Sequence, residues 1–239
     1  MADSVSVLVA KLGSRSKPDP SWTSKATGCT RERAERAVLE VAAYSASVME
    51  LCGNIDRTGR SYYAQFPAPI DLYALVRLVR PRTIVESGVA SGVSSAFMLM
   101  GAKTNSRGTL HSIDLPVLRT GRPGDESWAV PAGMSSGWAT PSSLRVGWDL
   151  REGRSEELLV PLLEELGTVD FFCHDSPVDR EHFEFEMQAV EPHLGPGSLV
   201  VADNTYRRAF GEAARRVGAE AVYRKGSSLG AFRVPADGA

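Results

Sequence analysis

Apolar residues along this chain follow two alternating periods, and the alternation predicts strands and helices in turn. Short, nearly continuous apolar runs, bounded by glycine, proline or acidic residues, predict strands at Thr83–Gly88, Thr109–Leu115, Asp149–Gly153, Val169–Asp175 and Ser198–Asp203. Segments with an apolar residue at every third or fourth position predict helices at Gly92–Ala102, Glu156–Leu166, Asp179–His193 and Tyr206–Val217. Apolar strands that alternate with helices are typical of an α/β protein with a parallel, doubly wound sheet.

The first part of the chain has a different pattern. Residues 1–28 are rich in serine, lysine and proline, which predicts poor order or at most a short helix and an arm. A helix is predicted from Thr30, whose side chain can cap it, to Leu51, and Gly53 is expected to end it. A second helix is predicted over Ile70–Val79.

The end of the chain predicts a hairpin. Ala221–Arg224 and Leu229–Val234 are short apolar segments separated by the sequence Lys-Gly-Ser-Ser. Together with the five parallel strands they complete a mostly parallel, seven-stranded, Rossmann-like sheet. We therefore expect an N-terminal arm with helices over residues 1–65 and one sheet domain over residues 66–239.

The connection over residues 116–148, between the second and third strands, is unusually long for a compact domain. It is rich in glycine, proline and serine and also carries tryptophans, which argue against simple disorder. We expect an inserted, lid-like loop that covers a substrate. A purely structural insertion is the alternative.

The composition is that of an ordinary globular protein, with 43% hydrophobic and 23% charged residues over 239 positions. The net charge of -2 argues against a nucleic-acid partner, and we interpret the pairs Arg207–Arg208 and Arg215–Arg216 as a solvated helix face. The apolar runs are too short for a membrane span. Three scattered cysteines fit neither a disulfide framework nor a zinc site, so we expect a reduced, cytoplasmic protein.

A glycine turn after the first strand is the most informative motif. The strand carries Glu86 near its end, and then Gly88 and Gly92 lead into a helix. A strand, a tight glycine turn and a helix N-terminus hold a nucleoside-like cofactor in many α/β proteins. A carboxylate at this turn would repel pyrophosphate but would favour an ammonium and a sulfonium. We therefore predict S-adenosylmethionine and not a dinucleotide.

The other strands of the predicted sheet also end in polar residues. Asp114 is placed to accept the hydroxyls of a ribose, and Ser155 to cap the next helix and face an adenine. Asp175, Asp203 and Asn204 follow two strands that are neighbours in the usual order, and their oxygens suit Mg²⁺. The alternative is that Asp203 and Asn204 only cap the following helix.

Taken together, these motifs over residues 66–235 resemble the class I S-adenosylmethionine-dependent methyltransferases, and most closely the small metal-dependent O-methyltransferases of the catechol O-methyltransferase kind. The resemblance implies that the cofactor contacts the residues of the glycine turn and the strand ends, namely Glu86, Gly88, Ala90, Ser91, Gly92, Ser94, Asp114, Arg154, Ser155 and Asp175. Within this set, Ser94 would meet the methionine carboxylate. The magnesium ligands would be Asp175, Asp203 and Asn204.

One departure concerns the general base. The catechol enzymes carry a lysine three residues after the fourth-strand acid, and here that position is Val178. The candidate catalytic residues are therefore Asp175 and His182, with His174 a weaker candidate. The expected activity is Mg²⁺-dependent O-methylation of a small molecule, and a homodimer is left open. Alternatives are metal-independent N- or C-methylation, a non-catalytic S-adenosylmethionine-binding protein, and, on fold alone, an NAD-linked oxidoreductase.

Overall fold

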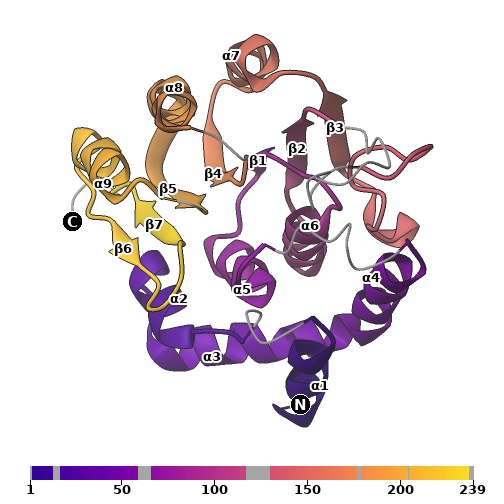
Figure 1. The fold of residues 1–239 in the computed structure, drawn as a ribbon. Helices are drawn as coiled ribbons and strands as arrows, with labels where there is room; N and C mark the ends of the chain where they lie inside the picture. Colours follow the sequence, from indigo (N-terminus) through magenta and orange to yellow (C-terminus); the bar gives the residue numbers. More distant parts are fainter. Residues whose placement is uncertain are drawn as a thin grey trace.

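The computed structural model describes residues 2–12, 17–58, 66–116, 130–176, 179–203 and 205–236. These residues form a seven-stranded sheet with helices on both faces (Figure 1). The strand order is β3-β2-β1-β4-β5-β7-β6. In chain order the strands are β1 (Thr83–Ser87), β2 (Thr109–Asp114), β3 (Trp148–Glu152), β4 (Val169–His174), β5 (Leu194–Ala202), β6 (Val222–Tyr223) and β7 (Gly230–Arg233).

The first five strands are parallel, whereas β7 pairs antiparallel to both β5 and β6. This confirms the predicted mostly parallel sheet with a terminal hairpin. The register aligns Ser87 of β1 with His174 of β4, and His174 with Ala202 of β5. Parallel strands all end at the same edge of a sheet, so the residues that follow β1, β2, β4 and β5 meet there.

Two layers of helices cover the two faces of the sheet (Figure 1). One face carries α5 and α6 and, beyond them, the N-terminal helices, while α7, α8 and α9 cover the other. Short 3₁₀ helices lie at Val41–Tyr44, Ser142–Leu144 and Glu191–His193. The α-helices are α1 (Ala2–Leu12), α2 (Pro20–Thr27), α3 (Arg31–Glu40), α4 (Ser45–Thr58), α5 (Pro69–Val79), α6 (Val93–Asn105), α7 (Ser155–Leu166), α8 (Arg180–Val190) and α9 (Arg207–Arg216).

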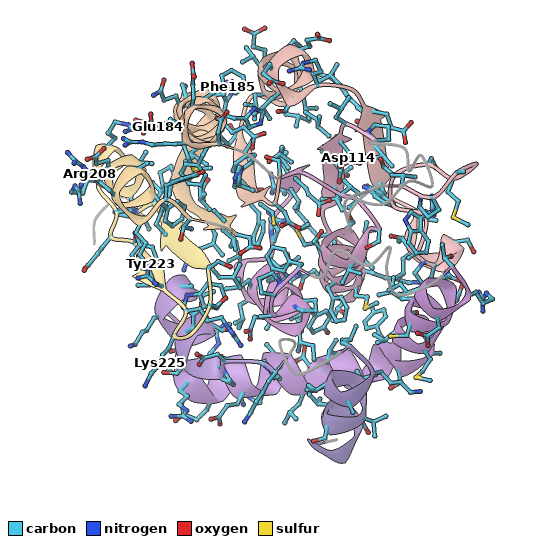
Figure 2. All side chains as sticks on the ribbon, in the orientation of Figure 1. Asp114, Glu184, Phe185, Arg208, Tyr223 and Lys225 are labelled. Atoms are coloured by element: carbon cyan, nitrogen blue, oxygen red, sulfur yellow. The ribbon has the colours of Figure 1, made fainter. Side chains whose placement is uncertain are left out.

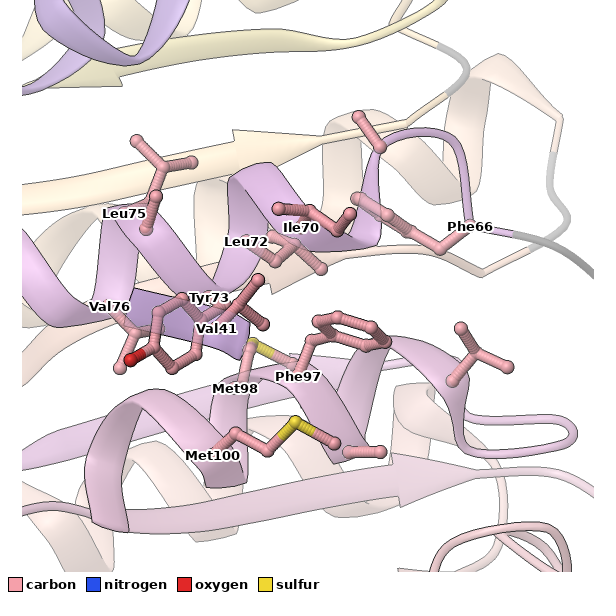
Figure 3. Packing of buried hydrophobic residues seen from close by; sticks show 14 of the residues in the cluster. Val41, Phe66, Ile70, Leu72, Tyr73, Leu75, Val76, Phe97, Met98 and Met100 are labelled. Atoms are coloured by element: carbon pink, nitrogen blue, oxygen red, sulfur yellow. The ribbon is translucent and has the colours of Figure 1, made fainter. Parts of the chain in front are cut away.

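The larger core lies between the sheet, α5 and α6 (Figure 3). Tyr73 of α5 and Phe97 of α6 are fully buried there, and both helices are apolar on nearly every side. A helix that is apolar all round must be covered on all sides. The N-terminal helices supply that cover, since Leu8, Val41 and Leu51 belong to the same core.

The N-terminal helices differ from the sequence prediction. Residues 1–28 contain two helices, α1 and α2, where poor order or a single short helix was expected. The helix predicted from Thr30 is capped by the Thr30 side chain as expected, but it is broken by a 3₁₀ turn at Val41–Tyr44. Gly53 lies inside α4 and does not end it.

The buried ion pair between Asp71 and Arg224 holds the start of α2 to the rest of the fold, because Asp71 also binds the backbone of Asp19, the cap of α2. The Asp71 carboxylate, at the start of α5, accepts hydrogen bonds from the Asp19 backbone N–H at 2.9 Å and from Arg224 Nε at 3.1 Å. Burial raises the pKa of Asp71 to about 6, against the effect of the Arg224 charge. The Trp22 indole N–H also donates to the Val222 carbonyl. No helix among the described residues combines the length and apolar character needed to cross a membrane.

Candidate cofactor site at the carboxyl edge of the sheet

The glycine turn between β1 and α6 takes the conformation that its sequence suggests. Gly88 and Gly92 have φ of 85° and 86°, a region that L side chains seldom adopt. A β-carbon on Gly88 would lie 2.4 Å from the Asp175 carbonyl oxygen, and one on Gly92 would lie 2.3 Å from Thr140 Oγ1. Glycine is therefore required at both positions, because the chain approaches the turn closely from two sides.

Glu86 lies beneath this turn and is fully buried. Its carboxylate accepts hydrogen bonds from the hydroxyls of Ser94, Ser95 and Ser112 at 2.6 to 2.7 Å. Burial raises the pKa of Glu86 to about 7, although these hydrogen bonds oppose the rise. Ser94, which the resemblance assigns to a methionine carboxylate, thus faces Glu86. The roles of both residues toward a cofactor stay predictions.

Asp114 lies at the same carboxyl edge of the sheet, as the last residue of β2 (Figure 2). Its Oδ1 accepts from the backbone N–H of Val89 at 2.8 Å and of Ala90 at 3.3 Å, and so holds the glycine turn in place. Its Oδ2 accepts from the Ser136 hydroxyl. Asp114 is only half-buried, so its carboxylate remains within reach of a ligand at the sheet edge.

The predicted lid-like loop is described from residue 130 onward, and residues 117–129 lie outside the described part. Its residues 136–140, which we call the docked segment, lie along the glycine turn. The Gly137 N–H donates to the Ala90 carbonyl at 2.8 Å, and the Ala139 N–H to the Ser91 carbonyl at 3.0 Å. Asn54 of α4 donates to the Ala139 carbonyl at 2.9 Å. This part of the loop therefore joins the N-terminal helices to the turn.

Two of the three predicted magnesium ligands meet at the ends of β4 and β5. The Asp203 N–H donates to the His174 carbonyl at 2.9 Å, which sets Asp203 beside Asp175. Burial, and next the negative charge of Asp203, raise the pKa of Asp175 well above its ordinary value. The Ser228 hydroxyl also donates to Asp203. Asn204, the third predicted ligand, lies outside the described residues.

No group of three or more His, Cys, Asp or Glu side chains within the described part of the chain is placed to hold a metal ion. The pair of carboxylates nevertheless fits a divalent cation by its chemistry. Adjacent acids repel one another unless a cation or a proton lies between them. Carboxylate oxygens are also the ligands that Mg²⁺ prefers.

His182 and His174 belong to a second hydrogen-bond network, on the face of the sheet that α7, α8 and α9 cover. Glu186 of α8 is fully buried and accepts from His174 Nδ1 at 2.6 Å and from His182 Nε2 at 2.9 Å. Burial alone would raise the pKa of Glu186, but the hydrogen bonds with the two histidines hold it well below the ordinary value. His174 Nε2 is buried without a hydrogen-bond partner in the described structure.

The contacts of His182 favour a structural role for this candidate base. Its Nδ1 lies 3.2 Å from Glu156 Oε1 and its Nε2 lies 3.0 Å from Ser155 Oγ, so the ring connects α7 to α8. The hydrogen bond with Glu186 raises the pKa of His182, against the effect of burial. Because both of its ring nitrogens are engaged by these contacts, His182 is poorly placed to accept a proton from a substrate.

The residues after β3 also differ in part from the prediction. Ser155 does not cap α7 but is its first residue, and Arg154 takes the cap position without a side-chain cap. The Arg154 guanidinium is exposed and pairs with Glu156 at 3.2 Å. The predicted adenine-side roles of Ser155 and Arg154 stay predictions.

Sequence reasoning missed Glu152, Ser136 and Glu186. Glu152 ends β3 opposite Asp114, and its Oε1 accepts from the Ser136 N–H at 2.9 Å. The rule that strand ends carry ligands would have found Glu152 if β3 had been placed one residue earlier. Ser136 and Glu186 had no comparable signal, because their partners lie far away in the sequence.

Comparisons with solved structures show that other proteins share this fold. A putative O-methyltransferase from Klebsiella pneumoniae is similar with a TM-score of 0.56 and 18% identity, over 86% of this chain and 100% of that one. An O-methyltransferase from Bacillus cereus in complex with SAH has a TM-score of 0.56 and 16% identity, over 84% and 99%. The O-methyltransferase TomG from Streptomyces achromogenes, in complex with SAM, has a TM-score of 0.50 and 18% identity, over 77% and 89%.

At these identities the solved structures show a shared fold. No curated protein matches the chain in sequence. The model of one family, described as a methyltransferase domain, matches residues 85–205, which include the glycine turn and both carboxylates after β4 and β5. Because this match spans just over half of the chain, the protein belongs to the methyltransferase domain family.

Proposed function

We propose that this protein transfers the methyl group of S-adenosylmethionine to an oxygen atom of a small molecule. The observation that carries the proposal is the meeting of the glycine turn, Asp114 and the Asp175–Asp203 pair at one edge of the sheet, inside the region that matches the methyltransferase family. The similar proteins from Bacillus cereus and Streptomyces achromogenes are O-methyltransferases whose structures hold SAH and SAM. That likeness supports the choice of cofactor and of oxygen as the acceptor.

The chain's own groups fit such a cofactor. The cap of α6 is Gly92, which has no side chain to accept from the first helical N–H groups. These donors, together with the positive end of the helix dipole, suit the carboxylate of a methionine moiety. The half-buried carboxylate of Asp114 suits a pair of ribose hydroxyls. S-adenosylmethionine, when bound, supplies an electrophilic methyl group for in-line displacement.

The main contribution of the protein to such a reaction is positioning. Holding two reactants in line contributes up to about 7–11 kcal/mol relative to a random encounter in solution. The close contacts of Gly88 and Gly92 keep the turn rigid, and the docked segment packs beside it. A rigid turn fixes where the cofactor lies relative to the carboxylates after β4 and β5.

Mg²⁺ belongs to this proposal as the ion held by Asp175 and Asp203, with Asn204 as the third protein ligand. When bound, the ion would orient an acceptor oxygen and lower its pKa. The support is the position of the two carboxylates after neighbouring strands, where burial, and next the negative charge of Asp203, raise the pKa of Asp175. No dedicated base is needed in that case, which agrees with the contacts that already engage His182.

Metal-independent methyl transfer is the second candidate. It is favoured by the surroundings of Asp175, because burial, and next the negative charge of Asp203, raise the pKa of this carboxyl group well above its ordinary value. A carboxyl group with a raised pKa can act as the base that accepts a proton from the acceptor.

Calorimetric titration with S-adenosylmethionine and S-adenosylhomocysteine tests the cofactor. Binding of both ligands supports the proposal, whereas a folded protein that binds neither refutes it. Repeating the titrations with Mg²⁺ and with EDTA then tests the metal.

Two variants separate the metal-dependent and metal-independent candidates. Asp203→Asn should abolish the heat of Mg²⁺ binding, while Glu164→Gln, an exposed residue on α7, should leave it unchanged. If both variants and the wild type give the same Mg²⁺ heat, the ion does not bind at the carboxylate pair.

A further inference from the structure

Helix α9 carries four arginines, which fall into two classes by their contacts. Arg208 pairs with Glu212 at 3.0 Å and Arg216 pairs with Glu191 at 2.6 Å. Within the described residues, no carboxylate lies at ion-pair distance from Arg207 or Arg215, and both are exposed. The two arginines without a carboxylate are eight positions apart, so they lie on one face of the helix two turns from each other.

Gly211 lies midway between these two arginines and leaves that face open. The structure has a hollow of about 520 Å³ there, lined by Arg207, Arg208 and Arg215 of α9, by the segment that leads to β6 and by Tyr223. A β-carbon on Gly211 would lie 3.6 Å from Arg215 Nη1 and 3.6 Å from Tyr223 Oη. The hollow therefore contains the guanidinium of Arg215 and the phenol hydroxyl within contact distance of one point.

Tyr223 joins the second arginine, Arg207, to the same hollow. The Arg207 guanidinium lies over the Tyr223 ring at 4.3 Å from its centroid, and Tyr223 Oη donates to the Arg207 carbonyl at 2.8 Å. Burial raises the pKa of Tyr223, and the positive charges of Arg207 and Arg215 both oppose that rise. Both cations are thus close enough to act on the same hydroxyl.

We propose that this hollow binds a small molecule through a phosphate group, with Arg207 and Arg215 as the anion ligands and Tyr223 as an apolar wall. Guanidinium groups bind phosphate oxygens in pairs of parallel hydrogen bonds. The volume lies in the range of small-ligand sites. Glu220 is the acidic residue at the hollow, so the balance of charge there is positive.

This interpretation revises the sequence-based view of the four arginines as a uniform solvated face. Arg208 and Arg216 do fit that view, because each satisfies a neighbouring glutamate. Arg207 and Arg215 do not, because both line a hollow that a glycine leaves open and neither is paired with a carboxylate among the described residues. Arg208 also lines the hollow, but it is paired with Glu212. The site lies outside the carboxyl edge of the sheet and does not depend on the proposed methyl transfer.

Calorimetric titration of the full-length protein with inorganic pyrophosphate, in low-salt buffer, tests the proposal. The matched variants are Arg215→Gln and Arg216→Gln, neighbouring residues of which only the first lines the hollow. We expect Arg215→Gln and Arg207→Gln each to weaken binding by about tenfold, since each removes a charge-assisted contact. Arg216→Gln should stay within about twofold of wild type, because its charge is already paired.

Gly211→Ala tests the shape of the site without changing its charge. The new methyl group fits without a clash, occupies the hollow and replaces a helix glycine. We therefore expect weaker pyrophosphate binding together with a higher melting temperature, which misfolding does not produce.

Three results would overturn the proposal. The first is the lack of any pyrophosphate heat from the folded wild type at millimolar concentration. The second is equal weakening by Arg215→Gln and Arg216→Gln, which would show general charge attraction. The third is binding of a short single-stranded RNA without binding of pyrophosphate, which would indicate a polyanion surface.

Discussion

Replacing Glu86 by glutamine removes a carboxylate that the fold keeps away from water. Glu86 is fully buried beneath the glycine turn, with three serine hydroxyls as its partners. Burial raises the pKa of Glu86 from 4.5 to about 7 in the folded protein. Between these two pH values the folded protein retains a proton that the unfolded chain has released. Stability therefore falls as pH rises through this window.

The size of this loss follows from the width of the window. An interval of about two and a half pKa units, at about 1.4 kcal/mol for each unit, amounts to about 3–4 kcal/mol. Glutamine has nearly the same shape as glutamate but does not ionise. The free energy of unfolding of Glu86→Gln, relative to wild type, should therefore increase by about 3–4 kcal/mol between pH 4.5 and about pH 8.

Urea unfolding followed by tryptophan fluorescence measures this difference at each pH. The control is Glu164→Gln, whose side chain is exposed on α7 and which should follow the wild-type pH dependence. Ser112→Ala removes one donor to the carboxylate and should extend the decline to higher pH than in the wild type. A difference between Glu86→Gln and wild type that stays constant within about 0.5 kcal/mol across the window would refute the reasoning.

Three further variants test the buried Glu186 of α8, the glycine turn and Asp114. Glu186→Gln should cost about 3 kcal/mol near neutral pH, because it removes a buried carboxylate that accepts hydrogen bonds from His174 and His182. Since the pKa of Glu186 lies below its ordinary value of 4.5, this cost should shrink as pH falls below 4.5 in urea unfolding. A cost that grows on acidification would contradict this. Gly88→Ala should lower the free energy of unfolding by about 3 kcal/mol in the same assay, since its methyl group would meet the backbone just after β4. A loss below about 1 kcal/mol would show that the turn can move. Asp114→Asn keeps an acceptor for the backbone of the glycine turn but loses the charge. Calorimetry should therefore show an affinity for S-adenosylhomocysteine about thirtyfold lower, with a nearly unchanged melting temperature. Wild-type affinity would mean that Asp114 only stabilises the turn.

The central strands could be predicted closely because their signal is local. β1, β2 and β4 begin at the predicted residues, since each is an apolar run with a clear turn residue before it. β5 begins four residues before its predicted start, at Leu194, because the glycines and the proline at its beginning are typical of a turn. These residues are tolerated there because β4 pairs with this part of β5 only at Leu194, and the next paired residue of β5 is Leu199.

The N-terminal helices could not be predicted in the same way. Their polar composition is typical of a disordered arm, and they are stabilised by residues far along the chain. Trp22, for example, is buried, and its indole N–H donates a hydrogen bond to the carbonyl of Val222. A pattern read within a short window does not contain such a contact.

The candidate site was predicted in position more than in detail. The end of each strand indicated Asp114, Asp175 and Asp203, and the structure brings them to one edge. The partners of these residues were not predictable, because Ser136 comes from a loop without periodicity. The same is true of Glu86, whose serine partners come from a helix and a neighbouring strand.

The part of the chain that identifies the family is smaller than the part that can fold. The family match starts at Val85, inside β1, and stops at Thr205, before the hairpin whose strand β7 pairs with β5. It also excludes α5, which is buried against the same face as α6. A fragment cut at these two residues would have a shortened central strand, an open edge at β5 and an uncovered apolar face, and is expected to aggregate. The minimal folding unit of this methyltransferase domain therefore includes the helices before it and the hairpin after it.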